Sequence, residues 1–294
     1  MDTTELLQKV RKIEIKTRSI SKHLFTGEYH STFKGRGMSF SEVRPYQYGD
    51  DIRNIDWNVT ARTNEAFVKI FEEERELTLM LLVDISPSSY FGTYQQLKKE
   101  WATEICAVLA FSAISNNDKV GLILFSDQIE LFIPPKKGKQ HILRILRELI
   151  NAEPKGLGTK LGDALQFFSN IIKKRSIGFI LSDFWDHQFE IPLRILGNKH
   201  DLIGIQLYDP AEESLPDLGF IRTFDKERKS YRWLDTSSAA LRAQYAARFQ
   251  QHLQTTRELF TKSASDLIQL RTDHSYIEAL MAFFKNRTKG AWRK

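Results

Sequence analysis

The feature that most constrains the fold is the run of seven apolar or β-branched residues at 77–83, which stops abruptly at Asp84. A continuous run of this kind is typical of a strand buried on both faces, as in a parallel sheet covered by helices. Asp84 therefore lies at the carboxyl end of a central strand. In open α/β sheets that edge is where ligands bind, because the loops that leave the strands gather there.

Two hydroxyl residues follow at alternate positions, which gives the spacing Asp84-x-Ser86-x-Ser88. A loop can turn three such oxygen-bearing side chains toward one point, and oxygen is the ligand that Mg²⁺ prefers. The same residue types also form turns and cap helices, so the pattern alone leaves a purely structural role open.

The rest of the chain alternates between strand-like and helix-like patterns. Strand followed by helix and strand implies right-handed crossovers and parallel pairing. We therefore expect an α/β protein with a Rossmann-like open, mostly parallel sheet and helices on both faces. Strands are expected near 119–125, 128–133, 176–182, 202–207 and 266–270, helices over 93–115, around 142–149, up to 173, over 238–261 and over 275–287, and a hairpin at 217–235.

Three regions are expected: an N-terminal amphipathic helix at 1–33, a segment at 34–76 that forms a small β-rich appendage, and the α/β domain at 77–294. The middle segment is rich in glycine, aromatic and charged residues, and its only strongly strand-like run is 66–71. Its acids Asp50, Asp51 and Asp56 permit two interpretations. They either form salt bridges and caps, or they build a second metal or phosphate site.

Composition excludes few classes of function. The net charge of +6 permits a nucleic-acid partner, but the basic clusters are short and lie in loops or at helix ends, so none is expected. The glycine-rich loop at 156–162 lacks the spacing of a nucleotide-binding loop. The single cysteine, Cys106, lies in an apolar helical pattern and is expected to serve packing. Without a secretory signal or an apolar stretch of roughly 20 residues, the chain is expected to be cytoplasmic, with no membrane span.

Polar residues at other strand exits strengthen the metal interpretation. Thr159 lies in the glycine loop, and Asp183 directly follows the strand at 176–182. Parallel strands bring their carboxyl ends to one edge, so both residues can meet Asp84 there. The set resembles the von Willebrand factor A (VWA) fold, whose metal-ion-dependent adhesion site combines Asp-x-Ser-x-Ser with a distant Thr and a distant Asp. The resemblance implies that Asp84, Ser86, Ser88, Thr159 and Asp183 hold Mg²⁺ or Mn²⁺, directly or through water.

The upstream segment is similar to the signature of the DUF58 family of bacterial proteins. The matching residues are Gly35, Gly37, Phe40, Arg44, Tyr46, Gly49, Asp50, Asp51, Arg53, Ile55, Asp56, Trp57, Ala61, Arg62 and Glu72 to Glu74. That family often has Met after the second serine, where this chain has Ser89, which leaves the ligand set intact. The resemblance also implies a partner, an AAA+ ATPase of the MoxR class.

The expected function is a metal-dependent protein-interaction module, an adaptor or co-chaperone rather than an enzyme, in which a partner's Asp or Glu completes the coordination of the cation. The alternative is a metal-dependent hydrolase, a phosphatase or nuclease that uses the same cation. Hydrolysis would need a general base near the metal, and the candidates are Asp186 and His187, which are also suited to capping a helix.

Overall fold

The computed structural model describes residues 39–63, 65–72, 77–93, 96–186, 188–225 and 230–291. The helix expected at 1–33 lies outside the described residues, as do the residues at the two expected domain boundaries, 33/34 and 76.

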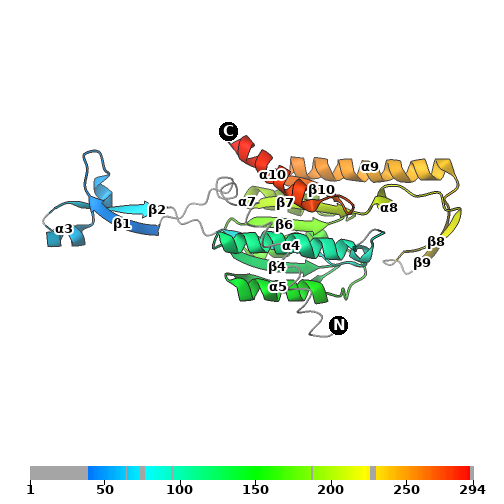
Figure 1. Ribbon diagram of the computed structural model, residues 1–294, viewed down its shortest axis with the longest axis horizontal. Helices are drawn as coiled ribbons and strands as arrows, with labels where there is room; N and C mark the ends of the chain where they lie inside the picture. Colours follow the sequence, from blue (N-terminus) through cyan, green and yellow to red (C-terminus); the bar gives the residue numbers. More distant parts are fainter. Residues whose placement is uncertain are drawn as a thin grey trace.

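A six-stranded sheet forms the centre of the molecule, in the order β10-β7-β6-β3-β4-β5 (Figure 1). All neighbouring strands pair in parallel except the edge strand β5, which is antiparallel to β4. This confirms the expected α/β class with a mostly parallel sheet. The strands are β3 (Thr78–Asp84), β4 (Lys119–Phe125), β5 (Ile129–Lys136), β6 (Ile177–Ser182), β7 (Asp201–Tyr208) and β10 (Asp266–Arg271).

The apolar run of β3 lies between β4 and β6, so both of its faces are covered. Its side chains alternate, because successive residues of a strand point to opposite faces. Leu79, Leu81 and Val83 enter one core, and Met80 and Leu82 enter the other. The continuous apolar pattern thus reflects burial on two sides.

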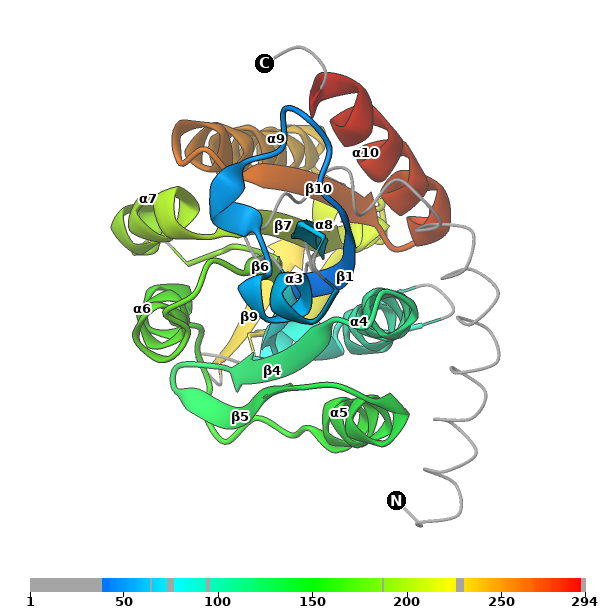
Figure 2. The same ribbon diagram turned by 90° about the vertical axis from the view of Figure 1, so that its left-hand side faces the viewer.

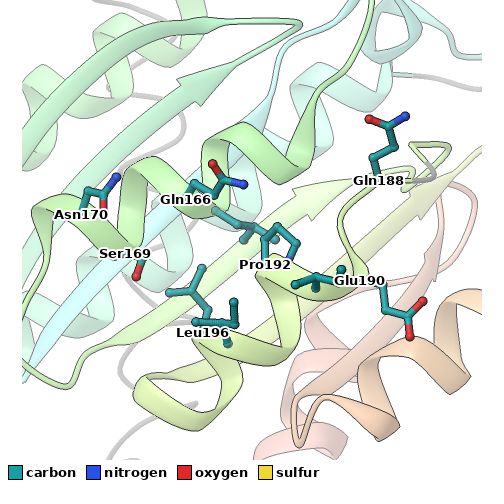
Figure 3. Close-up of a pocket in the computed structure, with 10 residues that line it drawn as sticks. Gln166, Ser169, Asn170, Gln188, Glu190, Pro192 and Leu196 are labelled. Carbon is teal, nitrogen blue, oxygen red and sulfur yellow. The ribbon is translucent and has the colours of Figure 1, made fainter.

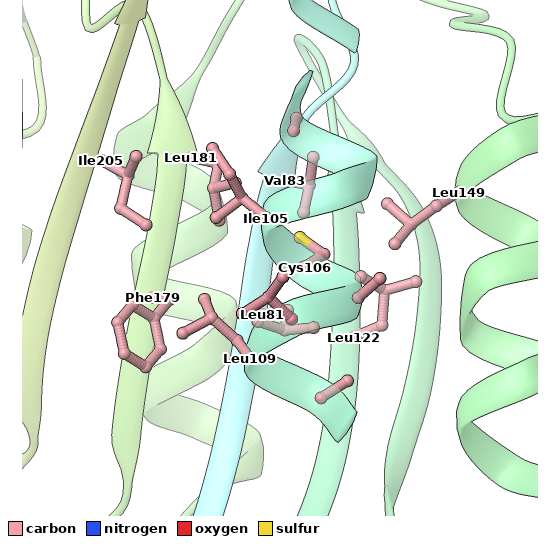
Figure 4. Close-up of a cluster of buried hydrophobic side chains, with 14 of the residues drawn as sticks. Leu81, Val83, Ile105, Cys106, Leu109, Leu122, Leu149, Phe179, Leu181 and Ile205 are labelled. Carbon is pink, nitrogen blue, oxygen red and sulfur yellow. The ribbon is translucent and has the colours of Figure 1, made fainter. Parts of the chain in front are cut away.

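Helices cover both faces of the sheet, as expected (Figure 2). On one face lie α4 (Lys98–Ser115), α5 (Lys139–Asn151) and α10 (Tyr276–Ala291); on the other lie α6 (Leu161–Ile171), α7 (Glu190–Lys199) and α9 (Ala239–Lys262). Cys106 of α4 is fully buried beside Leu81 and Ile105 in the first core (Figure 4). Burial raises the pKa of its thiol well above its ordinary value, which suits the packing role expected for it.

Some element ends differ from the sequence pattern. The helix expected from residue 93 begins at Lys98, and residues 87–90 form a short 3-10 helix, η2 (Pro87–Tyr90). The expected strand at 128–133 continues through Pro134 and Pro135, which is possible because β5 is an edge strand, where a missing N–H need not be paired. A short helix, α8 (Pro210–Glu213), follows β7 and was not expected.

Two small antiparallel sheets accompany the central one. The expected hairpin consists of β8 (Phe220–Asp225) and β9 (Ser230–Asp235). The other sheet joins β1 (Ser39–Pro45) to β2 (Phe67–Glu72), with η1 (Ile52–Asn54) and α3 (Trp57–Thr63) between them in the chain. The strand β1 was not expected, because its sequence contains few apolar residues.

None of the helices within the described ranges combines the length and the apolar character that crossing a bilayer requires.

Candidate metal site at the carboxyl edge of the sheet

Asp84 ends β3 and is only 6% exposed. Its two carboxylate oxygens accept different hydrogen bonds: Oδ1 from the backbone N–H of Ser86 at 2.9 Å, and Oδ2 from the hydroxyl of Ser182 at 2.7 Å. Burial, followed by the negative charge of Asp183, raises the pKa of Asp84 to about 6. Two hydrogen bonds thus fix the carboxylate in a buried environment that disfavours its ionised form.

The two serines of the motif lie on the turn that follows. Ser86 precedes η2 and is fully buried, and its hydroxyl oxygen is 3.0 Å from that of Ser88. Ser88 in turn lines one small cavity together with Asp84 and Asp183. Hydrogen bonds therefore connect Asp84, Ser86 and Ser88, and the Ser182 hydroxyl, which donates to Asp84, links the exits of β3 and β6.

Asp183 follows β6 and is 8% exposed. Burial raises its pKa, but the positive charge of the Lys98 ammonium group, followed by the nearby Ser88 hydroxyl, outweighs burial, so the net pKa lies below its ordinary value. Of the two aspartates, Asp183 therefore ionises more readily than usual and Asp84 less readily.

The turn after Asp183 is strained. Phe184 has φ +58°, in the left-handed region that a bulky side chain rarely adopts. Its buried ring packs against Phe260, with ring centroids 5.1 Å apart, and its N–H donates to the Ser182 hydroxyl at 3.1 Å. Core packing thus stabilises a conformation that places Asp183 at the sheet edge, and strain of this kind tends to occur at functional sites.

Thr159 lies at the same edge but outside this hydrogen-bonded chain. The N–H of the next residue, Lys160, donates to Ser126 O at the end of β4, and the N–H of Leu161 donates to Asp186 beyond β6. The loop is thereby fixed between the exits of two strands. Within the described residues, no hydrogen bond joins the half-buried Thr159 to the other four predicted ligands, so the structure brings together four of the five.

A cavity of about 20 Å³ lies between the two aspartates. Its volume suits a single water or ion. It is lined by Asp84, Ser88, Ser89, Lys98, Ala102, Leu181, Ser182, Asp183 and Leu207. In the described part of the chain, no group of three or more His, Cys, Asp or Glu side chains could hold a metal ion. The donor set here is of another kind, because it pairs two carboxylates with serine hydroxyls, and hard oxygen donors of this sort suit Mg²⁺ or Mn²⁺.

Lys98 and Glu212 belong to this site but did not emerge from the sequence. The Lys98 ammonium lies 3.1 Å from Asp183 Oδ2 and 2.7 Å from Glu212 Oε1. Burial lowers the pKa of Lys98, but Asp183 and then Glu212 outweigh it and raise the pKa above its ordinary value. Burial raises the pKa of Glu212 despite its contact with Lys98. A signal for Lys98 did exist: it stands four positions before Ala102, on the buried stripe of α4.

Asp186, the candidate general base, serves as a cap. One of its oxygens accepts the N–H of Leu161, the first residue of α6, at 2.8 Å, and the other accepts the N–H of Gln188 at 3.0 Å. His187 lies outside the described residues. The interpretation of Asp186 as a helix cap therefore fits its contacts, although the helix that it caps is α6 rather than the one that follows it.

The three acids of the upstream segment are all engaged in local contacts. Asp50 accepts both N–H groups of the Arg44 fork at 2.7 and 2.8 Å, and Asp51 pairs with Arg53. Asp56 caps α3 through the N–H groups at 58 and 59, and lies 3.6 Å from the Lys69 ammonium. These contacts favour salt bridges and caps over a second metal or phosphate site.

A larger hollow lies elsewhere, between α6 and α7 (Figure 3). This groove of about 680 Å³ is lined mainly by apolar and amide side chains, and Glu190 is the one acid among its described lining residues: Leu165, Gln166, Ser169, Asn170, Gln188, Glu190, Ile191, Pro192, Ile195 and Leu196. It shares no lining residue with the small cavity.

Comparison with known proteins yields relatives without an assigned function. An uncharacterized protein of Mycobacterium tuberculosis strain H37Rv is 28% identical over 294 residues, which cover 99% of this chain and 92% of that protein. The uncharacterized protein YeaD of Bacillus subtilis is 31% identical over 109 residues, 37% of this chain and 25% of its own length.

Among solved structures, the conserved hypothetical protein BatB from Bacteroides thetaiotaomicron is 14% identical with a TM-score of 0.46, over 74% of this chain and 100% of that one. The family model described as "Protein of unknown function DUF58" matches residues 42–255. The chain therefore belongs to the DUF58 family.

Proposed function

We propose that this protein is a metal-dependent protein-interaction module, built on a VWA-like domain, in which Mg²⁺ or Mn²⁺ at the carboxyl edge of the sheet is completed by an acidic side chain of a partner. The observation that carries the proposal is the convergence of Asp84, Ser88 and Asp183 from two strand exits around a cavity the size of one ion, with the Ser86 hydroxyl 3.0 Å from that of Ser88.

The charge of the site supports a cation. Asp84, Asp183 and Glu212 carry three negative charges when ionised, and Lys98 carries one positive charge, so two negative charges remain uncompensated in a buried place. Buried charges need partners, and one divalent cation would neutralise this group. Burial is the larger cause of the raised pKa of Asp84, and the negative charge of Asp183 adds to it.

The proposed ligands have different roles. Asp84 and Asp183 would supply charge, and the hydroxyls of Ser86 and Ser88 would supply neutral donors. Thr159, on a loop fixed at the same edge, is the remaining proposed ligand and would act directly or through water. A cation bound there offers a coordination position to an external carboxylate, because Mg²⁺ takes six ligands and usually keeps several waters. Asp and Glu of a partner protein supply such a group.

The partner that we propose is an AAA+ ATPase of the MoxR class. This proposal rests on the family resemblance and on the preference of the site for a carboxylate. The cytoplasmic location expected from the sequence stays a prediction.

Titration calorimetry with Mg²⁺ and Mn²⁺ on EDTA-treated protein tests the metal. We expect one site per chain, lost in Asp84→Asn and retained in Asp163→Asn, which removes an exposed carboxylate in the first turn of α6. Equal heats for the wild-type protein and Asp84→Asn would refute the site.

A pull-down with the purified ATPase tests the partner. Retention of the ATPase in Mg²⁺, and its loss both in EDTA and with Asp84→Asn, is expected. Retention that changes neither in EDTA nor with Asp84→Asn would refute metal-dependent capture. Hydrolysis of a phosphoester that requires Asp84 would favour the hydrolase instead.

A further inference from the structure

The Lys98 side chain is in an unusual place for a lysine. It is the first residue of α4, at the positive end of the helix dipole, and its side chain is only 3% exposed. Both circumstances disfavour a cation, because the helix N-terminus attracts negative charge and burial removes the hydration of the ammonium group. A specific compensation is therefore required.

Two carboxylates from different strand exits provide that compensation. Asp183 lies at the exit of β6, and Glu212 lies on α8 after β7; the Lys98 ammonium contacts both. Glu212 is itself fixed, because its second oxygen accepts the backbone N–H of Asp209 at 2.8 Å. The ammonium is thus held between two positioned acids.

Lys98 also lines the same small cavity as Asp84, Ser88 and Asp183. A charge in that position acts on any cation that enters, because the interaction of charges is strong where water is excluded. Lys98 shares Asp183 with the proposed metal, so the two cations compete for one carboxylate.

We propose that Lys98 is the resident cation of the site: it stabilises Asp183 and Glu212 when no metal is bound, and it lowers the affinity of the site for a divalent cation. This inference builds on the proposed function and adds the residue that sets metal affinity. Charge supplied by the protein lets the site keep its arrangement without metal, so that metal binding can be weak and reversible.

The test is Lys98→Met, which keeps the length of an unbranched side chain and removes its charge. The matched control is Lys160→Met, which removes an exposed lysine at the same edge of the sheet. For each EDTA-treated protein, calorimetry measures the Mg²⁺ affinity, and thermal unfolding is recorded with and without Mg²⁺.

The expected result for Lys98→Met is an Mg²⁺ affinity higher than that of the wild-type protein by on the order of tenfold or more, a lower Tm in EDTA, and recovery of the Tm in Mg²⁺. Lys160→Met is expected to match the wild-type protein. An unchanged affinity, or a Tm in EDTA equal to that of the wild-type protein, would overturn the inference.

A second variant keeps the test decisive if Lys98→Met does not fold. Glu212→Gln retains Lys98 but removes one of its two carboxylates, so the cavity becomes less negative and Lys98 relies on Asp183 alone. Its Mg²⁺ affinity is expected to fall by on the order of tenfold, a change opposite to that of Lys98→Met. An affinity that is unchanged or higher would overturn the inference.

The two proposals fail in different ways. If the wild-type protein does not bind Mg²⁺ but Lys98→Met does, the metal-dependent function fails and the role of Lys98 stands. If both bind Mg²⁺ with the same affinity, the role of Lys98 fails and the metal site stands. If neither binds Mg²⁺, both are refuted.

Discussion

Replacing Asp84 with Asn is expected to stabilise the metal-free fold. Burial and the charge of Asp183 raise the pKa of Asp84 from 3.8 to about 6, so at neutral pH the folded protein holds an ionised carboxylate in an unfavourable place. Each pKa unit corresponds to about 1.4 kcal/mol, which sets the cost at about 3 kcal/mol at pH 7.5. The Asn side chain has no charge to ionise and avoids this cost.

Both hydrogen-bond partners of Asp84 can still bind Asn, and the bond with Ser182 reverses its direction. The Asn carbonyl can accept the Ser86 N–H as Oδ1 does now at 2.9 Å, and its amide can donate to the Ser182 hydroxyl, which lies 2.7 Å from Oδ2. The change also removes the repulsion between the negative charges of residue 84 and Asp183. The gain of about 3 kcal/mol is therefore an upper value, because the Ser182 hydroxyl loses the acceptor that it has now.

The sign of the pH dependence follows from the raised pKa. The folded state holds the proton of Asp84 more tightly than the unfolded chain does, so the wild-type protein loses stability as pH rises from about 3.8 to about 6. The advantage of Asp84→Asn should grow from about 1 kcal/mol at pH 4.5 to about 3 kcal/mol at pH 7.5.

Urea unfolding in EDTA at the two pH values measures the difference, with Asp163→Asn as the control that should stay within about 0.5 kcal/mol of the wild-type protein. A Tm higher by on the order of 5 °C at pH 7.5 would accompany the full effect. Loss of stability in Asp84→Asn at pH 7.5, or an advantage that does not change with pH, would refute the argument. A functional residue that lowers the stability of the fold is a common compromise in proteins.

Two further predictions concern positions away from the site. Gly197→Ala should lower the free energy of unfolding in urea by about 1–3 kcal/mol, because the added Cβ would lie 2.0 Å from the backbone oxygen of Ser263. The control is Asn198→Ala, at an exposed position on the same helix. Equal stability of the two variants would contradict the packing argument. His200 is 2% exposed, and burial, followed by the charges of Lys199 and Arg175, lowers its pKa to about 4. The neutral His200 therefore contributes its full stability above pH 6.5, and this stability is lost as pH falls toward 4. His200→Leu should accordingly lose less free energy of unfolding than the wild-type protein between pH 7 and pH 4.5. A parallel loss in both proteins would contradict this.

The sequence located the elements of the central sheet well, because their burial leaves a local pattern. The strand β3 is apolar without interruption since both of its faces are covered, and that run reveals a central strand before any partner is known. By contrast, β1 has no such pattern, because it pairs with β2 in a small sheet, and among the described residues of that sheet Val68 is the one buried side chain.

The sequence by itself determined the α/β class, the position of Asp84 at a strand exit and the oxygen chemistry of Asp-x-Ser-x-Ser, since these depend on residues close together in the chain. Only the tertiary structure decided which distant groups join them. The ammonium of Lys98 reaches Asp183 and Glu212 because parallel strands bring their exits to one edge, across separations of 85 and 114 residues. Such contacts leave no local pattern, because a buried charge is compensated by whichever side chains the fold places beside it.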